Sequence, residues 1–149
     1  MAVTAPRIIL AAFVLALAQA HADQAADARA KLEVIARGLS EGNPADAISP
    51  FDKSYPDYEK LSGYFGGLTN AFQIVNEIDV VDEQDTGTDT TLTVHWTITL
   101  SDLGSNYTER RASDLQVRLI LKDLKWKIVQ FAPIGIFDPK PKPWPKPAG

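Results

Sequence analysis

Few side chains in this sequence have the chemistry for catalysis or metal binding. The chain has no Cys and two histidines, His21 and His95. Metal centres and nucleophilic sites draw mainly on Cys, His and clustered carboxylates, and no Ser lies in a nucleophile-elbow motif. We therefore expect no metal site, no cofactor and no Ser-His-Asp triad. Any acid–base chemistry would depend on an inward carboxylate assisted by Tyr or Arg.

The element that must position these candidates is the stretch Thr91–Leu100, which reads TLTVHWTITL. Strict alternation of apolar and polar residues in a β-branched, aromatic segment predicts a half-buried strand. The alternation places Trp96 on the face toward the core and His95 on the opposite, wetter face. We expect a central antiparallel strand with one face covered.

Keeping apolar residues on one face also predicts how the neighbouring strands pair. The expected pairs include Val80 with Leu92, Asn76 with Trp96, Trp96 with Ser113, Leu121 with Trp126, Leu119 with Ile128 and Val117 with Gln130. All three predicted hairpins then agree on which face is inside, and this consistency supports the arrangement.

A small group of polar residues falls on the predicted inner face around Trp96. With Trp96 they form a candidate ligand pocket of Asn76, Trp96, Tyr107, Glu109, Arg111, Ser113 and Gln130. An apolar cavity with a few convergent polar groups is the usual form of a small-ligand site. The alternatives are a solvated Glu109–Arg111 ion pair at the rim, and Asn76 and Ser113 bonded to each other or to a trapped water.

A charge cluster is expected on the outer face, where Glu77 and Asp114 flank His95. The favoured interpretation is a solvated cross-strand network, with a catalytic or metal-binding role as the alternative. The same face is a candidate homodimer surface, supported by three apolar residues expected there, Ile120, Val129 and Phe131.

The predicted elements are three helices followed by four strands. The helices are Asp23–Leu39, a short one that begins at Pro44 with Asn43 as its N-cap, and one from Tyr58 to Phe72. The strands are Phe72–Glu83, Asp89–Ser101, Tyr107–Lys122 and Lys125–Phe137. Because the connectors are short, the strands should form an antiparallel meander. The fold class is α+β, with the helices packed on a curved four-stranded sheet.

This order of elements resembles the nuclear transport factor 2-like superfamily, which includes polyketide cyclases and ketosteroid isomerases. The helix break at Gly42-Asn43-Pro44 and the final-strand phrase Lys125-Trp126-Lys127-Ile128-Val129 carry the likeness. The resemblance covers about residues 24–138 and implies a cystatin-like cone whose open end often holds a ligand. Enzymes of the superfamily use an inward Asp, Tyr or His, and none of their motifs matches this sequence residue by residue.

Both ends of the chain differ in composition from the middle. Residues 1–22 combine the apolar run Ile8–Ala18 with Ala20-His21-Ala22, which indicates a signal peptide cut after Ala22. We therefore expect a secreted or periplasmic protein with no membrane span after cleavage. Residues 23–138 would form the domain, and Pro139–Gly149 reads as a Pro/Lys-rich disordered tail.

Charge excludes one class of partner. Residues 23–138 contain 11 basic and 19 acidic side chains, a net charge of −8. An acidic body repels phosphate backbones, so nucleic-acid binding is not expected.

Three functional hypotheses follow from the sequence. The first is an exported non-catalytic module that binds an apolar small molecule or forms a homodimer. The second is a small isomerase, dehydratase or hydrolase that uses an inward carboxylate in the cone. The third is an envelope adaptor that acts through its Pro-Lys tail.

Overall fold

The computed structural model describes residues 26–140 and has the predicted α+β architecture. A first helix covers residues 26–40 and is followed by α2 (Pro44–Ile48) and α3 (Tyr58–Ala71). The strands are β1 (Phe72–Asp85), β2 (Asp89–Asp102), β3 (Thr108–Lys122) and β4 (Lys125–Ala132), and a 3₁₀ turn, η1 (Gly135–Phe137), follows them. The predicted cleavage site and most of the Pro-Lys tail lie outside the described residues.

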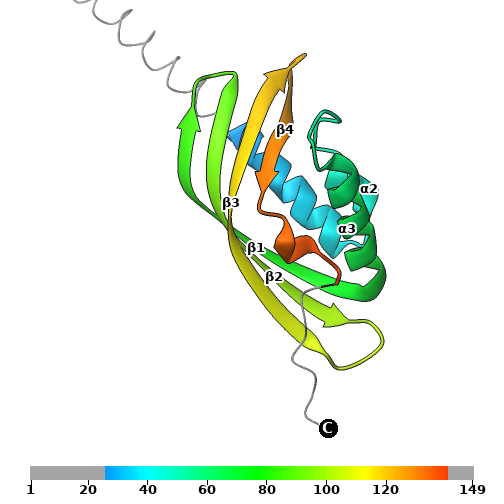
Figure 1. Ribbon diagram of the computed structural model, residues 1–149. Coiled ribbons are helices and arrows are strands. Elements are labelled where there is room, and N and C mark those ends of the chain that lie inside the picture. The colour runs from blue at the N-terminus through cyan, green and yellow to red at the C-terminus, as the bar shows by residue number, and fades with distance from the viewer. Residues whose placement is uncertain (1–25, 141–149) are drawn as a thin grey trace, which may run out of the picture.

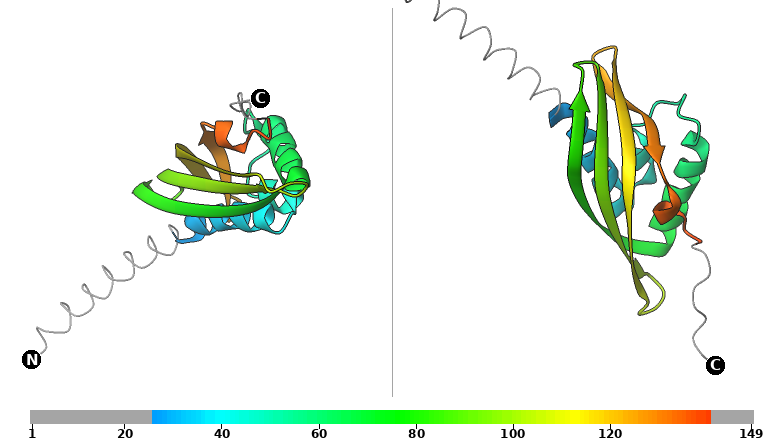
Figure 2. Two further views of the ribbon diagram at one scale, coloured as in Figure 1. Left: turned by 90° about the horizontal axis from the view of Figure 1, so that it is seen from below. Right: turned by 60° about the vertical axis from the view of Figure 1, so that its left-hand side comes forward.

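The four strands form one antiparallel meander in the order β1-β2-β3-β4. The sheet curves, and the helices lie on its concave side (Figures 1 and 2). Burial alternates along β2, where Leu92, Val94, Trp96, Ile98 and Leu100 are completely buried. The other face of the sheet is not covered by any of the described helices, as the right-hand view of Figure 2 shows.

The break between the first helix and α2 follows from local backbone chemistry. Gly42 adopts a positive φ of 72°, which favours glycine, and the Asn43 side chain then accepts a hydrogen bond from the Asp46 amide. A Cβ at Gly38 would lie 2.5 Å from the Ala47 backbone nitrogen. Glycine therefore allows the two helices to approach each other closely before the chain turns toward α3.

Strand pairing agrees with the predicted register in one hairpin and departs from it in two. Between β2 and β3, Trp96 lies opposite Ser113 as expected. Between β1 and β2, Val80 lies opposite Val94 and not Leu92, a shift of two residues, and β1 has a bulge at Val81. A two-residue shift preserves the inner face, so the burial prediction survives the wrong pairing.

The last hairpin changes face part-way along because β4 has a bulge. Leu121 pairs with Trp126 and Leu119 with Ile128, as predicted, but Val117 pairs with Phe131. The extra residue, Val129, switches the alternation. Phe131 is consequently in the core with no exposed surface, which corrects its predicted place on the outer face.

The strand also ends earlier than predicted, at Ala132. The next peptide bond, Ala132–Pro133, is cis, and residues 134–137 turn back over the sheet and do not extend it. Ile136 and Phe137 of this segment belong to the core. Within residues 26–140 no helix has the length and apolar character needed to cross a membrane.

Candidate functional site

The cone interior, where the sequence predicted a ligand pocket, is filled by aromatic side chains. Trp96 lies edge-on to Phe131 and Phe137, with ring centroids 5.9 and 5.5 Å apart. Phe137 also packs edge-on against Phe65 of α3, at 5.6 Å. None of these four side chains has any exposed surface. Trp96 is therefore enclosed by protein on the side from which a ligand was expected to reach it.

Asn76 is satisfied by protein groups and connects the first helix to the sheet. Its side-chain Nδ2 donates to the Ala36 carbonyl at 3.2 Å, and its Oδ1 accepts from Trp96 Nε1 at 2.9 Å. Asn76 lies opposite Ile98, so the long indole reaches it diagonally. Asn76 and Trp96 therefore have a structural role. The sequence had instead suggested Ser113 or a trapped water molecule as the hydrogen-bond partner of Asn76.

Arg111 is the residue that holds the segment after β4 over the cone. Its Nη1 donates to the carbonyls of Ile136 and Asp138 at 2.8 and 2.7 Å. Its Nε donates to Glu109 at 3.0 Å, and the two side chains are only 9% and 19% exposed. The Glu109–Arg111 pair is therefore part-buried and structural, in contrast to the solvated rim pair that the sequence suggested as an alternative.

The remaining pocket candidates are not gathered into one site. Ser113 is half-buried beside Trp96, whereas Tyr107 is 42% exposed near the β2–β3 turn. Gln130 is exposed because of the Val129 bulge, so its predicted inward position is wrong. The structure brings together Asn76 and Trp96, and separately Glu109 and Arg111.

The outer-face charge cluster keeps His95 and Asp114 together, but Glu77 is not part of it. His95 Nδ1 lies 2.7 Å from Asp114 Oδ1, as the register of β2 and β3 predicted. The strand shift places Asp79 opposite His95 and moves Glu77 opposite Thr97, so the predicted place of Glu77 beside His95 is wrong. Glu77 is 3.9 Å from Arg110, and both side chains are about 70% exposed, which is a weak ion pair.

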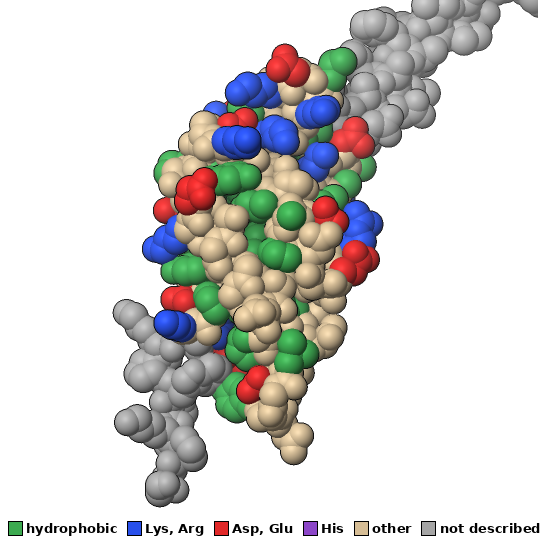
Figure 3. All heavy atoms as spheres, turned by 90° about the vertical axis from the view of Figure 1, so that its right-hand side faces the viewer, with side chains coloured by type: hydrophobic (Ala, Val, Ile, Leu, Met, Phe, Trp, Pro, Cys, Tyr) green, Lys and Arg blue, Asp and Glu red, His purple; other side chains and the backbone are tan. Residues whose placement is uncertain are grey.

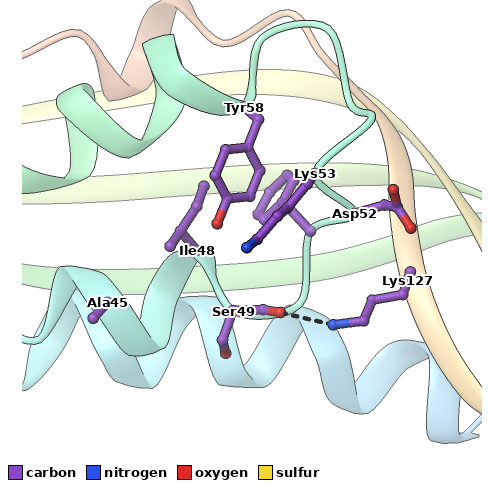
Figure 4. Close-up of a pocket in the computed structure, with 8 residues that line it drawn as sticks. Ala45, Ile48, Ser49, Asp52, Lys53, Tyr58 and Lys127 are labelled. Atoms are coloured by element: carbon purple, nitrogen blue, oxygen red, sulfur yellow. Dashed lines mark hydrogen bonds between the residues drawn. The ribbon is translucent and has the colours of Figure 1, made fainter.

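A hollow that the sequence did not predict opens between α2, the following loop and β4 (Figure 4). It has a volume of about 670 Å³ and is lined by Ala45, Ile48, Ser49, Phe51, Asp52, Lys53, Tyr58 and Lys127. In Figure 4, Lys53 and Tyr58 extend across the hollow from the loop and the start of α3, and Lys127 enters from the strand. The Lys127 ammonium donates to the Ser49 carbonyl at 3.3 Å.

The hollow combines an apolar floor with a positive rim. Ile48 and Phe51 are buried in the core behind it. The Asp52 carboxylate accepts from the Ser54 amide at 2.9 Å and lies 3.6 Å from Lys122. Hydrogen bonding to the Ser54 side chain and amide lowers the pKa of Asp52, and Lys122 adds a smaller effect in the same direction. Among the described residues, no carboxylate lies within ion-pair distance of Lys53 or Lys127.

No sequence pattern indicated this hollow, because it depends on a contact between distant segments. Phe51 forms a parallel bridge with Ile128, and the Asp52 amide donates to the Ile128 carbonyl at 2.9 Å. This contact places Lys53 beside Lys127, which is 74 residues further along the chain. Among the described residues, no group of three or more His, Cys, Asp or Glu side chains is placed to hold a metal ion.

Comparison with solved structures identifies the fold. A conserved protein from Planctomyces limnophilus superposes with a TM-score of 0.68 and 10% identity, over 76% of this chain and 95% of that one. A Salmonella enterica protein of the nuclear transport factor 2-like superfamily gives 0.53 and 9% identity, over 79% and 92% of the two chains. This chain has the nuclear transport factor 2-like fold. The resemblance inferred from the order of elements is thereby confirmed.

The nuclear transport factor 2-like fold is shared with enzymes as well as with proteins of unknown function. A scytalone dehydratase-like protein from Novosphingobium aromaticivorans superposes with a TM-score of 0.68 and 8% identity, over 76% of this chain and 85% of that one. No family model and no curated protein matches the sequence. At such identities the likeness shows the fold alone.

Proposed function

We propose that this chain is an exported, non-catalytic module that binds a small amphipathic anion in the hollow beside α2. The observation that carries the proposal is the pair of lysine ammonium groups, Lys53 and Lys127, over an apolar floor. A carboxylate or phosphate head would lie between the lysines, and an apolar tail would cover Ile48 and Tyr58. The proposal moves the ligand site from the cone interior to its outside.

The filled cone argues against the enzyme hypothesis. A carboxylate base in this fold needs space for a substrate beside it, and the inward carboxylate predicted from the sequence, Glu109, is engaged by Arg111. Arg111 in turn holds the chain that covers the cone. Phe131 and Phe137 occupy the volume next to Trp96, so a substrate would have to displace core side chains.

Binding of decanoate, followed by thermal shift and calorimetry, tests the proposal. We expect decanoate to raise the melting temperature and decanol, which lacks the charge, to raise it much less. Lys53→Gln and Lys127→Gln should each weaken decanoate binding several-fold. Lys60→Gln is the matched control, because Lys60 lies on α3 near the Tyr64 ring and outside the hollow. Equal effects of decanoate on wild type and Lys53→Gln would refute the site.

A homodimer through the outer sheet face is the second candidate. The supporting observation is that this face is uncovered and includes Val75, which is 56% exposed on β1. Light scattering should then give twice the chain mass, and Ala112→Arg, at the middle of the face opposite Thr97, should restore a monomer. Monomeric wild type at high concentration would exclude this candidate.

Export is proposed on the leader alone. The apolar run and the Ala20-His21-Ala22 motif support secretion or a periplasmic location, with Asp23 as the first mature residue. Mass spectrometry of the secreted or periplasmic fraction should give a chain that begins at Asp23. Recovery of the intact Met1 segment would contradict it.

The adaptor role of the Pro-Lys tail remains a proposal, and deletion of the tail tests retention in the envelope.

A further inference from the structure

The start of the Pro-Lys tail is fixed to the body of the protein. The Asp138 carbonyl accepts from Arg111 Nη1 at 2.7 Å, and the Lys140 amide donates to the Asp138 carboxylate at 2.8 Å. Pro139, between them, packs on α3 so closely that a Cβ at Gly67 would lie 2.7 Å from its Cγ. These contacts determine where the rest of the tail leaves the described fold.

The described chain ends at the cone mouth, by which we mean the end of the molecule that carries the β2–β3 turn (Figures 1 and 2). This turn contains two large hydrophobic side chains that are exposed, Leu103 at 62% and Tyr107 at 42%. Desolvation is the main cause of the raised pKa of Tyr107, and the charges of Glu109 and Arg111 also act on its hydroxyl. The Tyr107 ring therefore lies beside Arg111, which holds the tail at Asp138.

The composition of the tail supplies a partner for this surface. Residues 141–149 include one large apolar side chain other than proline, Trp144, which lies between Pro143 and Pro145. Alternating prolines favour an extended polyproline II segment that advances about 3.1 Å per residue, which gives Trp144 a reach of about 12 Å from Lys140. Such segments bind aromatic surfaces at a small cost in conformational entropy, because the prolines already restrict the backbone.

We propose that the Pro-Lys tail folds back over the cone mouth of its own chain, with the Trp144 ring packed against Tyr107. Two aromatic rings in contact gain from edge-to-face or offset stacking as well as from the apolar area that they bury. The tail of the same chain is favoured over that of a second copy because it begins beside the site. A short tether gives it an effective concentration in the millimolar range.

Charge at the cone mouth also favours a basic tail. Three acids, Asp102, Glu109 and Asp138, and one base, Arg111, lie on the turn, the inner face and the anchored segment. The neighbouring Arg110 is on the opposite face of the sheet, where it is 69% exposed near Glu77. Figure 3 shows that most Lys and Arg side chains on the face it presents gather at the other end of the molecule. The lysines of the tail are therefore attracted to the mouth.

NMR relaxation of the ¹⁵N-labelled protein, with its tail intact, tests the proposal. We expect the Trp144 amide to have an order parameter close to the value of about 0.85 that a rigid backbone gives. A nuclear Overhauser effect should connect the Trp144 indole to the Tyr107 ring. Tyr107→Ala should remove the contact and lower the Trp144 order parameter below about 0.6. Leu124→Ala is the control, because Leu124 is 95% exposed in the β3–β4 turn at the far end of the molecule (Figure 1).

A second pair of variants tests the anchor and leaves Tyr107 in place. Gly67→Ala puts a methyl group 2.7 Å from Pro139 Cγ, so it should displace the start of the tail and lower the Trp144 order parameter. Gly66→Ala is the matched control, since a Cβ there would meet no described neighbour within 4 Å beyond its own helix. Both changes raise helix propensity by the same amount, so the difference between them reports the contact with the tail.

Three results would overturn the proposal. The first is a Trp144 order parameter below about 0.6 in wild type, and the second is an equal order parameter in wild type and Tyr107→Ala. The third is a Trp144–Tyr107 contact that appears only between labelled and unlabelled chains in a mixed sample, which would assign the tail to a second copy. Tyr107 does not line the hollow beside α2, so decanoate binding by Tyr107→Ala should be unchanged.

Discussion

Arg111 shows how a residue that resembles a ligand-binding group can be structural. Sequence reasoning placed it correctly on the inner face near the cone, because period-two alternation determines the face. Its partners were beyond prediction, since the carbonyls of Ile136 and Asp138 reach it only when the chain turns back after Pro133. The guanidinium satisfies three acceptors that would otherwise be partly desolvated.

Replacing Arg111 should therefore be costly. Arg111→Leu removes both carbonyl contacts and leaves Glu109 part-buried without its partner, so we expect a loss of about 3–5 kcal/mol in the free energy of unfolding. Denaturant titration measures it. The double variant with Glu109→Leu should recover part of the loss. Arg110→Leu, 69% exposed on the opposite face, is the control and should change stability little. Equal losses for Arg110→Leu and Arg111→Leu would contradict this account.

Trp96 and Asn76 lead to a second prediction at the level of single residues. Trp96→Ala should lower the free energy of unfolding by about 3–5 kcal/mol, as for other large buried aromatics. Trp96→Phe should lose less, but it leaves the Asn76 oxygen without its donor, at a cost of about 1–3 kcal/mol. Unfolding titrations of the two variants separate packing from the hydrogen bond. A loss below about 1 kcal/mol for Trp96→Ala would show that the ring is not in the core.

Among the elements, the strands were predictable in face and order but not in every pairing. Alternation cannot locate a bulge, because the inserted residue at Val81 or Val129 resembles its neighbours in type. Because of the Val129 bulge, Gln130 is exposed and Phe131 is in the core, which is the opposite of their predicted positions. The same bulge brings the Phe131 carbonyl within 2.6 Å of the Tyr55 hydroxyl, which donates to it. The loop after α2 is thereby connected to β4.

Alkaline pH should reveal this contact. Burial, with a smaller effect from Asp57, raises the pKa of Tyr55 to about 12. An unfolded Tyr ionises near pH 10. The stabilisation that the protonated Tyr55 phenol provides is therefore fully present below about pH 10. It is lost as the pH rises through the folded-state pKa. Tyr55→Phe should be less stable than wild type at pH 7, and the gap should narrow by about pH 11. A gap that stays constant would exclude this linkage.

For the whole molecule, fold class and the covered sheet face were predictable, and the closure of the cone was not. Closure depends on Phe137, which sequence reasoning assigned to the end of an extended strand. The β-forming residues Ile134, Ile136 and Phe137 suggested a strand there. The 3₁₀ turn forms because Ile136 and Phe137 gain burial in the core, where Phe137 packs against Trp96 and Phe65. Tertiary packing overrides propensity in such cases.

Opening the cone should convert it into a site for small apolar molecules. Phe137→Ala removes a ring with no exposed surface, at a cost of about 3–5 kcal/mol, and leaves an apolar cavity beside Trp96. Toluene should then raise the melting temperature of Phe137→Ala and leave that of wild type unchanged. Ile134→Ala, at a partly buried neighbour of the core, is the control and should not gain toluene binding. A wild type that toluene stabilises equally would mean that the cone is already open.

The late position of Phe137 in the chain determines when the core can close during synthesis. Synthesis runs from the N-terminus, and Phe137 follows every other core residue of the described part. A nascent chain that has reached β4 has all four strands but still exposes the rings of Trp96 and Phe65 that Phe137 covers. The core cannot close before that late segment emerges from the ribosome. Until Phe137 emerges, the nascent chain keeps this part of its core unpacked, a condition that would favour the export proposed above.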